Sequence, residues 1–197
     1  DIAYLKCVQD LIVSSPRNGN ELRNLLYTAL EYKDGPFAIR YPKASSEEFD
    51  QNLQGELLPI GSWEVLQNGN DVAILAVGPL TYLALEAAEE LKKLDISCEV
   101  VNCRFIKPMD ENYLEFMLEK FSSVLTIEEG VRSGGFGEGV LSWLSSNNYK
   151  GNSSIISLPD KFVEHGPRDL LLEKWGINKE QIIKTVTSFK SSLKTEF

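Results

Sequence analysis

Apolar and polar positions in the first 44 residues follow the pattern of a strand, a helix and a second strand. A short apolar run ends in a turn at Pro16, apolar positions recur at helical spacing over residues 18–32, and a compact apolar run over residues 36–42 is stopped by Pro42. Two strands and one helix leave too much apolar surface uncovered to fold alone. We therefore expect this segment to be the edge of a larger α/β domain.

A different rhythm begins at Ile60, after a polar, acidic and aperiodic stretch from Lys43 to Leu58 that predicts a linker. Strand-like and helix-like stretches then alternate about four times, which predicts an α/β fold with a mostly parallel sheet covered on both faces. The turn at residues 68–71 predicts an antiparallel hairpin at the edge of this sheet. The later strands are expected at 97–108, 123–130 and 153–159, and the helices at 81–94, 111–121, 137–147 and, as one or two, within 167–190.

The composition of the 197-residue chain narrows the possible partners. Hydrophobic residues make up 43% and charged residues 25%, as is ordinary for a soluble globular protein. The formal net charge of −9 and the pI of about 4.8 argue against a nucleic acid partner, because binding to phosphate backbones draws on an excess of Lys and Arg. No apolar run approaches the ~20 residues that a membrane span needs.

The cysteines and the single histidine argue against a metal site and a disulfide framework. Cys7, Cys98 and Cys103 cannot all pair, and none lies in a C-x-x-C motif or a Cys/His cluster. Cys98 and Cys103 flank a strand-like run, which predicts buried free thiols and favours a reducing compartment. With His165 as the only histidine, no zinc site is predicted.

Functional groups in open α/β sheets gather beyond the carboxyl ends of the strands, and the first such end here carries two cations, Arg40 and Lys43. These side chains could hold a carboxylate or a phosphate, since Arg offers a planar fork and Lys a point charge. In the alternative, Arg40 pairs with an acidic neighbour and Lys43 is solvated at the start of the linker. The residues alone favour this alternative, because surface cations are mostly structural.

The second and third strand ends have structural interpretations that outweigh the chemical ones. At the second, Asp110 is expected to cap a helix and Arg104 to form a buried ion pair. At the third, Glu128 and Glu129 precede a glycine-rich turn, residues 134–139, that enters a helix. Such a turn can cradle phosphate, but glycines that allow close packing of helix on sheet are the better interpretation.

The fourth strand end precedes a loop that contains His165, between Glu164 and Gly166. A loop histidine can titrate near neutrality. A lone histidine is more often a surface or packing residue, and no Ser/His/Asp or Cys/His arrangement accompanies it. The chemistry of the residues therefore predicts an α/β protein with a strand end, at Arg40 to Lys43, that is suited to binding an anion. We call these four residues the strand tip.

Several stretches of the sequence, in the order in which they occur, resemble a known enzyme family. "DIAYLKCVQDLIVSSPRNGNELRNLLYTALEYKDGPFAIRYPKA" resembles the latter half of the pyrimidine-binding domain of 1-deoxy-D-xylulose-5-phosphate synthases, which are transketolase-like enzymes. "LPIGSWEVLQNGNDVAILAVG", "VVNCRFIKPMDENYL", "TIEEGVRSGGFGEGV" and "LPDKFVEHG" resemble their transketolase C-terminal domain in the same order. The resemblance implies an incomplete pyrimidine-binding domain at 1–44, a linker at 45–59 and a C-terminal domain at 60–197.

The family resemblance implies thiamine diphosphate and Mg²⁺, the condensation of pyruvate with D-glyceraldehyde 3-phosphate with loss of CO₂, and a place in isoprenoid, thiamine and pyridoxal biosynthesis. Both cofactors would be bound mainly upstream of Asp1, so no catalytic or metal-binding residue is expected in this chain. The resemblance implies that Lys43 stands where the family usually has an Arg that binds the substrate phosphate. Arg40 and His165 are further substrate-binding candidates.

The resemblance also implies a homodimer in the bacterial cytoplasm or the plastid stroma. A start at Asp1 rather than Met is expected to reflect proteolysis, a gap or truncation, with the N-terminal portion of the enzyme as a companion and the isolated fragment inactive. Looser similarity leaves two other thiamine enzymes open, a pyruvate dehydrogenase beta-type subunit and a transketolase. A non-catalytic dimerisation or regulatory module also stays open.

Overall fold

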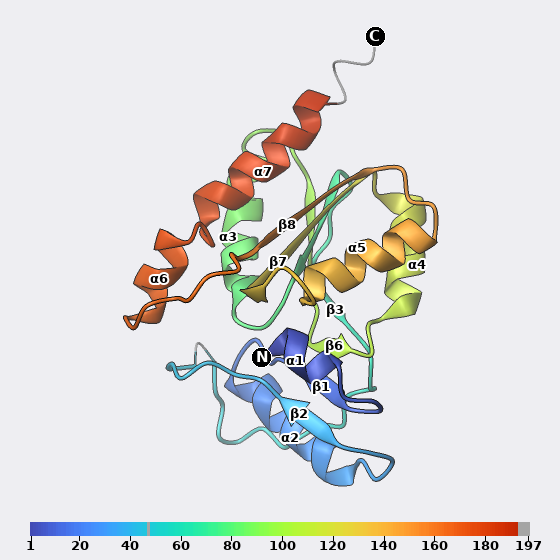
Figure 1. Ribbon diagram of the computed structural model, residues 1–197, viewed down its shortest axis with the longest axis vertical. Helices are drawn as coiled ribbons and strands as arrows, with labels where there is room; N and C mark the ends of the chain where they lie inside the picture. Colours follow the sequence, from blue (N-terminus) through green and yellow to red (C-terminus); the bar gives the residue numbers. More distant parts are fainter. Residues whose placement is uncertain (47, 193–197) are drawn as a thin grey trace.

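Two β-sheets organise the chain, and the smaller sheet lies below the larger one in the computed structural model (Figure 1). The structure describes residues 1–46 and 48–192, with side chains up to Phe189. The larger sheet has the strand order β3-β5-β4-β7-β8 and the smaller one β2-β1-β6. The strands are β1 (Ile12–Ser14), β2 (Phe37–Ile39), β3 (Glu64–Gln67), β4 (Val72–Ala76), β5 (Cys98–Asn102), β6 (Phe105–Lys107), β7 (Ser123–Val131) and β8 (Asn152–Leu158).

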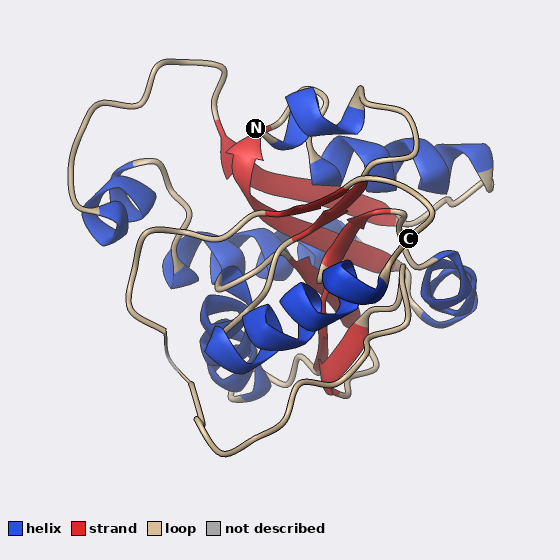
Figure 2. Cartoon of the chain, turned by 90° about the horizontal axis from the view of Figure 1, so that it is seen from below, coloured by secondary structure: helices blue, strands red, loops and turns tan. Residues whose placement is uncertain are grey.

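Helices cover both faces of the larger sheet, so that its strands form the middle layer (Figures 1 and 2). Alternate residues of β4 face opposite ways: Ile74 packs with α3 and α7, whereas Leu75 packs with α4 and α5. Strands β5, β4, β7 and β8 are parallel. The predicted mostly parallel α/β sheet is therefore confirmed. The helices are α1 (Ile2–Lys6), α2 (Gly19–Glu31), α3 (Leu80–Lys92), α4 (Glu111–Lys120), α5 (Phe136–Ser146), α6 (Arg168–Lys174) and α7 (Lys179–Ser192).

The predicted edge hairpin is wrong in its pairing, although an antiparallel edge strand exists. Strand β3 pairs antiparallel with β5, and β4 lies on the other side of β5. Strand β4 is buried at all five positions, whereas β3 is half-buried. Parallel sheets are typically covered on both faces, and the buried strand β4 has parallel neighbours, β5 and β7, so the local turn at residues 68–71 does not join paired strands.

The single strand predicted for residues 97–108 is also wrong, because the chain forms two strands there. Strand β5 belongs to the larger sheet, and β6 crosses to the smaller sheet, where it pairs antiparallel with β1. The backbone N–H of Ser15 donates to the carbonyl of Arg104, between the two strands, at 2.8 Å. Residues 1–44 and the later part of the chain therefore share one sheet.

The stretch between β2 and β3 runs along α2 and is hydrogen-bonded to it. Three α2 side chains at four-residue spacing, Asn20, Asn24 and Thr28, accept from the backbone N–H groups of residues 50, 56 and 58 at 2.9, 3.1 and 2.9 Å. One face of α2 thus anchors this segment, which contains no helix or strand in its described residues, 40–46 and 48–63.

Several local predictions hold in detail. Asp110 caps α4 as predicted, by accepting from the backbone N–H of the third helical residue, and Asn18 caps α2 in the same way. Cys98 and Cys103 are buried free thiols, and Cys7 is exposed. Helix α1 was not predicted, since its five residues are too few to show a helical period.

Candidate functional site

Arg40 lies at the carboxyl end of β2 and is held by two groups of the same chain. Its Nε donates to Oδ2 of Asp1 at 2.8 Å, and its Nη2 donates to the backbone carbonyl of Glu129 at 2.6 Å. Burial lowers the pKa of the guanidinium, which the charge of Glu129 partly opposes. The pairing with an acidic neighbour that the sequence favoured is confirmed. Contact between Arg40 and a substrate stays a prediction.

Lys43 lies three residues beyond Arg40 and has a different environment. Its side chain is exposed, and no hydrogen bond or ion pair to it is found within residues 1–46 and 48–192. Tyr41, between the two cations, is 61% exposed. The strand tip therefore presents one cation that is anchored in the fold and one that is available to a ligand.

The crevice where open α/β sheets usually bind ligands is filled by residues 1–44. In the larger sheet this position lies at the carboxyl ends of β4 and β7, where the strand order reverses. A Cβ at Gly78, just after β4, would lie 2.6 Å from Oγ of Ser15. Nearby, Nδ2 of Asn102 donates to Oε1 of Glu21 on α2 at 2.7 Å. The first segment thus occupies this edge, and the candidate site moves to its own strand tip.

The glycine-rich turn holds a carboxylate of the chain itself. Glu128 is fully buried, and its two oxygens accept from the backbone N–H groups of Phe136 and Gly137 at 2.9 and 2.8 Å. Burial raises the pKa of Glu128, against these two hydrogen bonds. A Cβ at Gly137 would lie 2.4 Å from Oγ1 of Thr126. The close-packing interpretation of the glycines is confirmed, and the helix N-terminus is already occupied by an anion.

Glu129 forms a bidentate ion pair with Arg168, which sequence reasoning missed. Nε and Nη2 of Arg168 donate to Oε2 of Glu129 at 2.9 and 2.7 Å, and the two side chains are 24% and 21% exposed. Arg168 follows the loop after β8, and β8 is the parallel neighbour of β7. Because the carboxyl ends of neighbouring parallel strands meet at one edge, an acidic pair after one strand and an Arg after the next was the available signal.

His165 lies in the exposed loop between β8 and α6, three residues before Arg168. In the part of the chain that the structure describes, no hydrogen bond or ion pair involves its imidazole. Arg168 lines a cavity of about 380 Å³ together with Tyr41 and Pro42 of the strand tip. The loop that carries His165 therefore returns to the strand tip, and a role of His165 toward substrate stays a prediction.

Arg104 confirms its predicted structural role. Its Nε and Nη2 donate to the carbonyl and the hydroxyl of Ser62, both at 2.9 Å, and its Nη1 lies 3.7 Å from Oε1 of Glu21. The carboxylate of Glu21 is buried and also accepts from the backbone N–H of Arg17 at 2.6 Å. This network connects α2 with the residues after β5 and is part of the scaffold of the strand tip.

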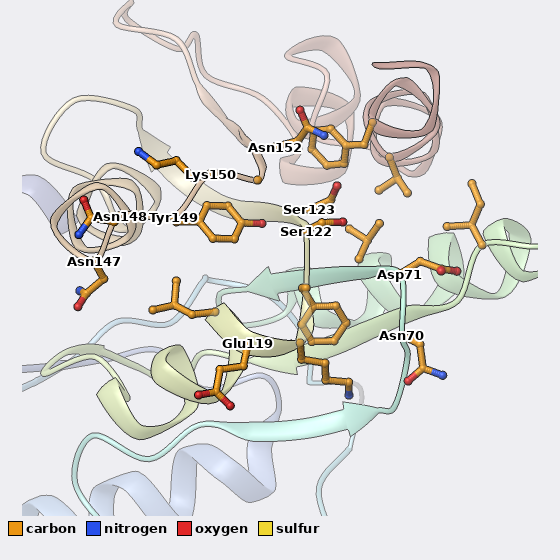
Figure 3. A pocket seen from close by; sticks show the side chains of 18 residues that line it. Asn70, Asp71, Glu119, Ser122, Ser123, Asn147, Asn148, Tyr149, Lys150 and Asn152 are labelled. Atoms are coloured by element: carbon orange, nitrogen blue, oxygen red, sulfur yellow. The ribbon is translucent and has the colours of Figure 1, made fainter. Parts of the chain in front are cut away.

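A cavity of about 780 Å³ lies at the opposite edge of the larger sheet, where β4, β7 and β8 begin (Figure 3). Lys120, in its lining, donates to the buried carboxylate of Glu99 at 2.5 Å, and Asp71 accepts from the backbone N–H of Ser97 at 2.6 Å. None of the site residues predicted from the sequence lines this cavity. Two of its charged groups are thus engaged within the fold, and the cavity lies at the other edge of the sheet from the strand tip.

Residues 1–46 and 48–192 show neither a cluster of metal-binding side chains nor a helix suited to a membrane. No group of three or more His, Cys, Asp or Glu side chains is arranged to hold a metal ion there. None of the described helices is both long and apolar enough to cross a membrane.

Comparisons with known proteins agree with the resemblance seen in the sequence. The family model described as "Transketolase, C-terminal domain" matches residues 61–182. Proteins named 1-deoxy-D-xylulose-5-phosphate synthase from Bacillus cereus (strain AH820) and Geobacillus sp. (strain WCH70) are 41% and 43% identical over 189 residues. These residues are 94% of this chain but 30% of each relative, so the chain spans about a third of their length.

A solved structure gives the same fold. It is described as "Split gene transketolase, inactive beta4 tetramer", and it matches with a TM-score of 0.85 and 29% identity over 95% of this chain and 60% of the other. Since the family model covers more than half of the residues, this chain belongs to the transketolase C-terminal domain family.

Proposed function

We propose that this chain is the C-terminal portion of a 1-deoxy-D-xylulose-5-phosphate synthase, which condenses pyruvate with D-glyceraldehyde 3-phosphate and releases CO₂. The observation that carries the proposal is the 41–43% identity to proteins of that name over 94% of the chain. The enzyme would supply isoprenoid synthesis in a bacterial cytoplasm or a plastid. Residues 1–44 would then complete a pyrimidine-binding domain, 45–59 a linker and 60–197 the C-terminal domain.

Thiamine diphosphate and Mg²⁺ would be bound by the upstream part of the enzyme. The described residues of this chain provide no cluster of metal-binding side chains, and the one helix N-terminus in the glycine-rich turn is filled by Glu128. The residues present therefore do not fit the diphosphate and its metal, and we derive no step through the cofactor from this chain. The fragment alone is accordingly proposed to be inactive.

Exposed apolar side chains on α1 and α2 support an upstream partner for residues 1–44. Tyr4 is 80% exposed and Leu30 70% exposed, and Leu26 and Tyr27, also on α2, are exposed. Large apolar side chains exposed together on one helix suggest a contact surface. We assign it to the N-terminal portion of the same polypeptide, and we propose a homodimer of the complete chain.

Lys43 is the residue that we propose to bind the phosphate of glyceraldehyde 3-phosphate. Its ammonium is exposed at the strand tip, while Arg40 is anchored beside it. A Lys offers a point charge rather than the bidentate fork of an Arg, so its contact with phosphate is less directional. Arg40 and His165 are proposed to contribute to the same substrate region.

The test is a turnover assay of the complete enzyme with thiamine diphosphate, Mg²⁺, pyruvate and glyceraldehyde 3-phosphate, in which CO₂ and deoxyxylulose phosphate are measured. A charge-assisted hydrogen bond contributes about 1.5–3 kcal/mol, so Lys43→Ala should raise the KM for glyceraldehyde 3-phosphate about 10–100-fold and leave the KM for pyruvate unchanged. Lys43→Arg is the matched control and should keep a low KM. Equal changes in both KM values would refute the assignment of Lys43.

The same assay separates the alternatives. Turnover with a lipoyl group or with sugar phosphates, in place of glyceraldehyde 3-phosphate, would identify a pyruvate dehydrogenase-type subunit or a transketolase. Full activity after deletion of residues 60–197 would make this domain a dispensable module. His165→Ala, measured beside Lys43→Ala, should raise the same KM, and unchanged kinetics would remove His165 from the site.

A further inference from the structure

The strand tip is connected to the loop after β8 through one residue, Glu129. The backbone carbonyl of Glu129 accepts from Nη2 of Arg40 at 2.6 Å, and its carboxylate accepts three hydrogen bonds from Arg168, at 3.2, 2.9 and 2.7 Å. Glu129 lies on β7, a nine-residue strand that is buried over most of its length. A single rigid position thus supports Arg40 from one side and is itself fixed by Arg168 from the other.

The charges explain why Arg168 is needed for this arrangement. The pKa of Arg40 is raised by the charge of Glu129 and lowered by that of Arg168, so the three groups lie within electrostatic range of one another. With Arg168 in place, both carboxylate oxygens of Glu129 are engaged, and Arg40 is bound by the carbonyl. Without Arg168, the half-buried carboxylate of Glu129 would lose its ion pair and would be attracted to Arg40, with which it already interacts. Movement of Arg40 toward this carboxylate would displace the strand tip.

The strand tip is the segment that such a shift would move. The backbone N–H of Arg40 donates to the carbonyl of Ser14 on β1 at 2.8 Å. Among the described residues, this is the last backbone hydrogen bond to β1 before the chain reaches Lys43. Beyond it, Tyr41 and Pro42 line the same 380 Å³ cavity as Arg168. The position of Lys43 therefore depends on the anchoring of Arg40.

We propose that Arg168 is a positioning residue for substrate binding: it fixes Glu129, and through Glu129 and Arg40 it holds Lys43 where the substrate phosphate binds. This inference rests on the proposed function for the identity of the substrate. The second ion pair of Arg168, to Asp169 at 3.8 Å, involves a carboxylate that is 95% exposed, and it contributes little.

The chain contains a matched control for Arg168. Lys174 lies on the same helix, α6, and forms an ion pair with Glu164. Both side chains of that pair are well exposed, and neither contacts Glu129 or the strand tip. Lys174→Ala removes the same charge from the same helix as Arg168→Ala does, without affecting the connection to Arg40.

The experiment uses the complete enzyme and compares Arg168→Ala, Arg168→Lys, Lys174→Ala, Glu129→Gln and the double variant of positions 129 and 168. We expect Arg168→Ala to raise the KM for glyceraldehyde 3-phosphate about tenfold, as for loss of ~1.4 kcal/mol, with kcat and the KM for pyruvate within about twofold. Arg168→Lys should restore part of the affinity. The double variant should be no worse than Arg168→Ala, since both changes act through one connection.

Hydrogen exchange provides a readout that does not depend on turnover. Backbone amides of residues 38–44 should exchange faster in Arg168→Ala than in the parent enzyme, whereas Lys174→Ala should leave them unchanged. Unchanged exchange in Arg168→Ala, or equal changes in both KM values and kcat, would overturn the inference. If the parent enzyme does not turn over pyruvate and glyceraldehyde 3-phosphate, the proposed function fails, and the exchange measurement still decides whether Arg168 positions the strand tip.

Discussion

Helix α5 packs closely against the larger sheet, and substitutions at two of its glycines, Gly137 and Gly139, test how close this packing is. A Cβ at Gly137 would lie 2.4 Å from Oγ1 of Thr126 and 2.8 Å from a methyl group of Ile155. Both neighbours are β-branched residues on strands of the sheet, and Thr126 is fully buried. A Cβ at Gly139 would instead meet Nζ of Lys6 at 2.9 Å, which is the end of a flexible side chain.

The two substitutions should therefore have opposite effects on stability. Replacement of Gly by Ala inside a helix stabilises it by about 0.8–1 kcal/mol. Overpacking of a well-packed core costs about 1–3 kcal/mol, and the 2.4 Å approach at Gly137 places that substitution in the upper part of this range. We expect Gly137→Ala to lower the free energy of unfolding by about 1–2 kcal/mol and Gly139→Ala to leave it unchanged or raise it by up to about 1 kcal/mol.

Urea unfolding followed by Trp fluorescence is the assay, since Trp143 lies on α5 itself. A shift of the midpoint at constant slope reports a change in stability. If Gly137→Ala stabilised the protein as much as Gly139→Ala, the close approach of α5 to the sheet would not be what requires a glycine at position 137.

Two further predictions concern buried titratable groups. Burial raises the pKa of Glu128 above its ordinary value of 4.5, so the folded state keeps this proton to a higher pH than the unfolded state does. Stability should therefore fall as the pH rises from 4.5 through the folded-state pKa. The urea midpoint of Glu128→Gln should fall less steeply over this pH range, and a slope identical to that of the parent protein would contradict the assignment. Burial raises the pKa of Cys98 to about 12 and that of Cys103 well above its ordinary value, whereas Cys7 is exposed. A thiol reagent should therefore react with one cysteine in the folded protein and with three after unfolding. Rapid reaction of all three in the folded state would disprove this burial.

Elements with a strong local signal were predictable from the sequence. The amphipathic period of α2 and the Asn18 cap depend on neighbours within four residues, and both are found. The close packing of the glycine-rich turn was likewise favoured, because Glu138 within the turn would repel an anion. The carboxylate that fills the helix N-terminus, Glu128, lies on the strand immediately before the turn.

Strand partners were not predictable, because an apolar run shows that a strand is buried but not which strand lies beside it. Residues 98–106 are buried at nearly every position, since β5 is buried in the larger sheet and β6 in the smaller one. The turn at residues 68–71 was a true chain reversal, but β3 found its partner in β5, about thirty residues on. Local turn chemistry fixes the direction of the chain and leaves the pairing to packing.

The same limit applies to the candidate site, and it explains why the sequence suggested Lys43 as a candidate but gave no sign of the Glu129–Arg168 ion pair. Two cations at the end of an apolar strand are a local pattern, whereas Glu129 and Arg168 come from distant parts of the sequence and meet only because β7 and β8 are parallel neighbours. Strand β6 binds residues 1–44 into the same body by pairing with β1. In our proposal the C-terminal domain sets the position of the strand tip, so substitutions at the carboxyl ends of its strands should affect substrate binding even where the substituted residue does not touch the substrate.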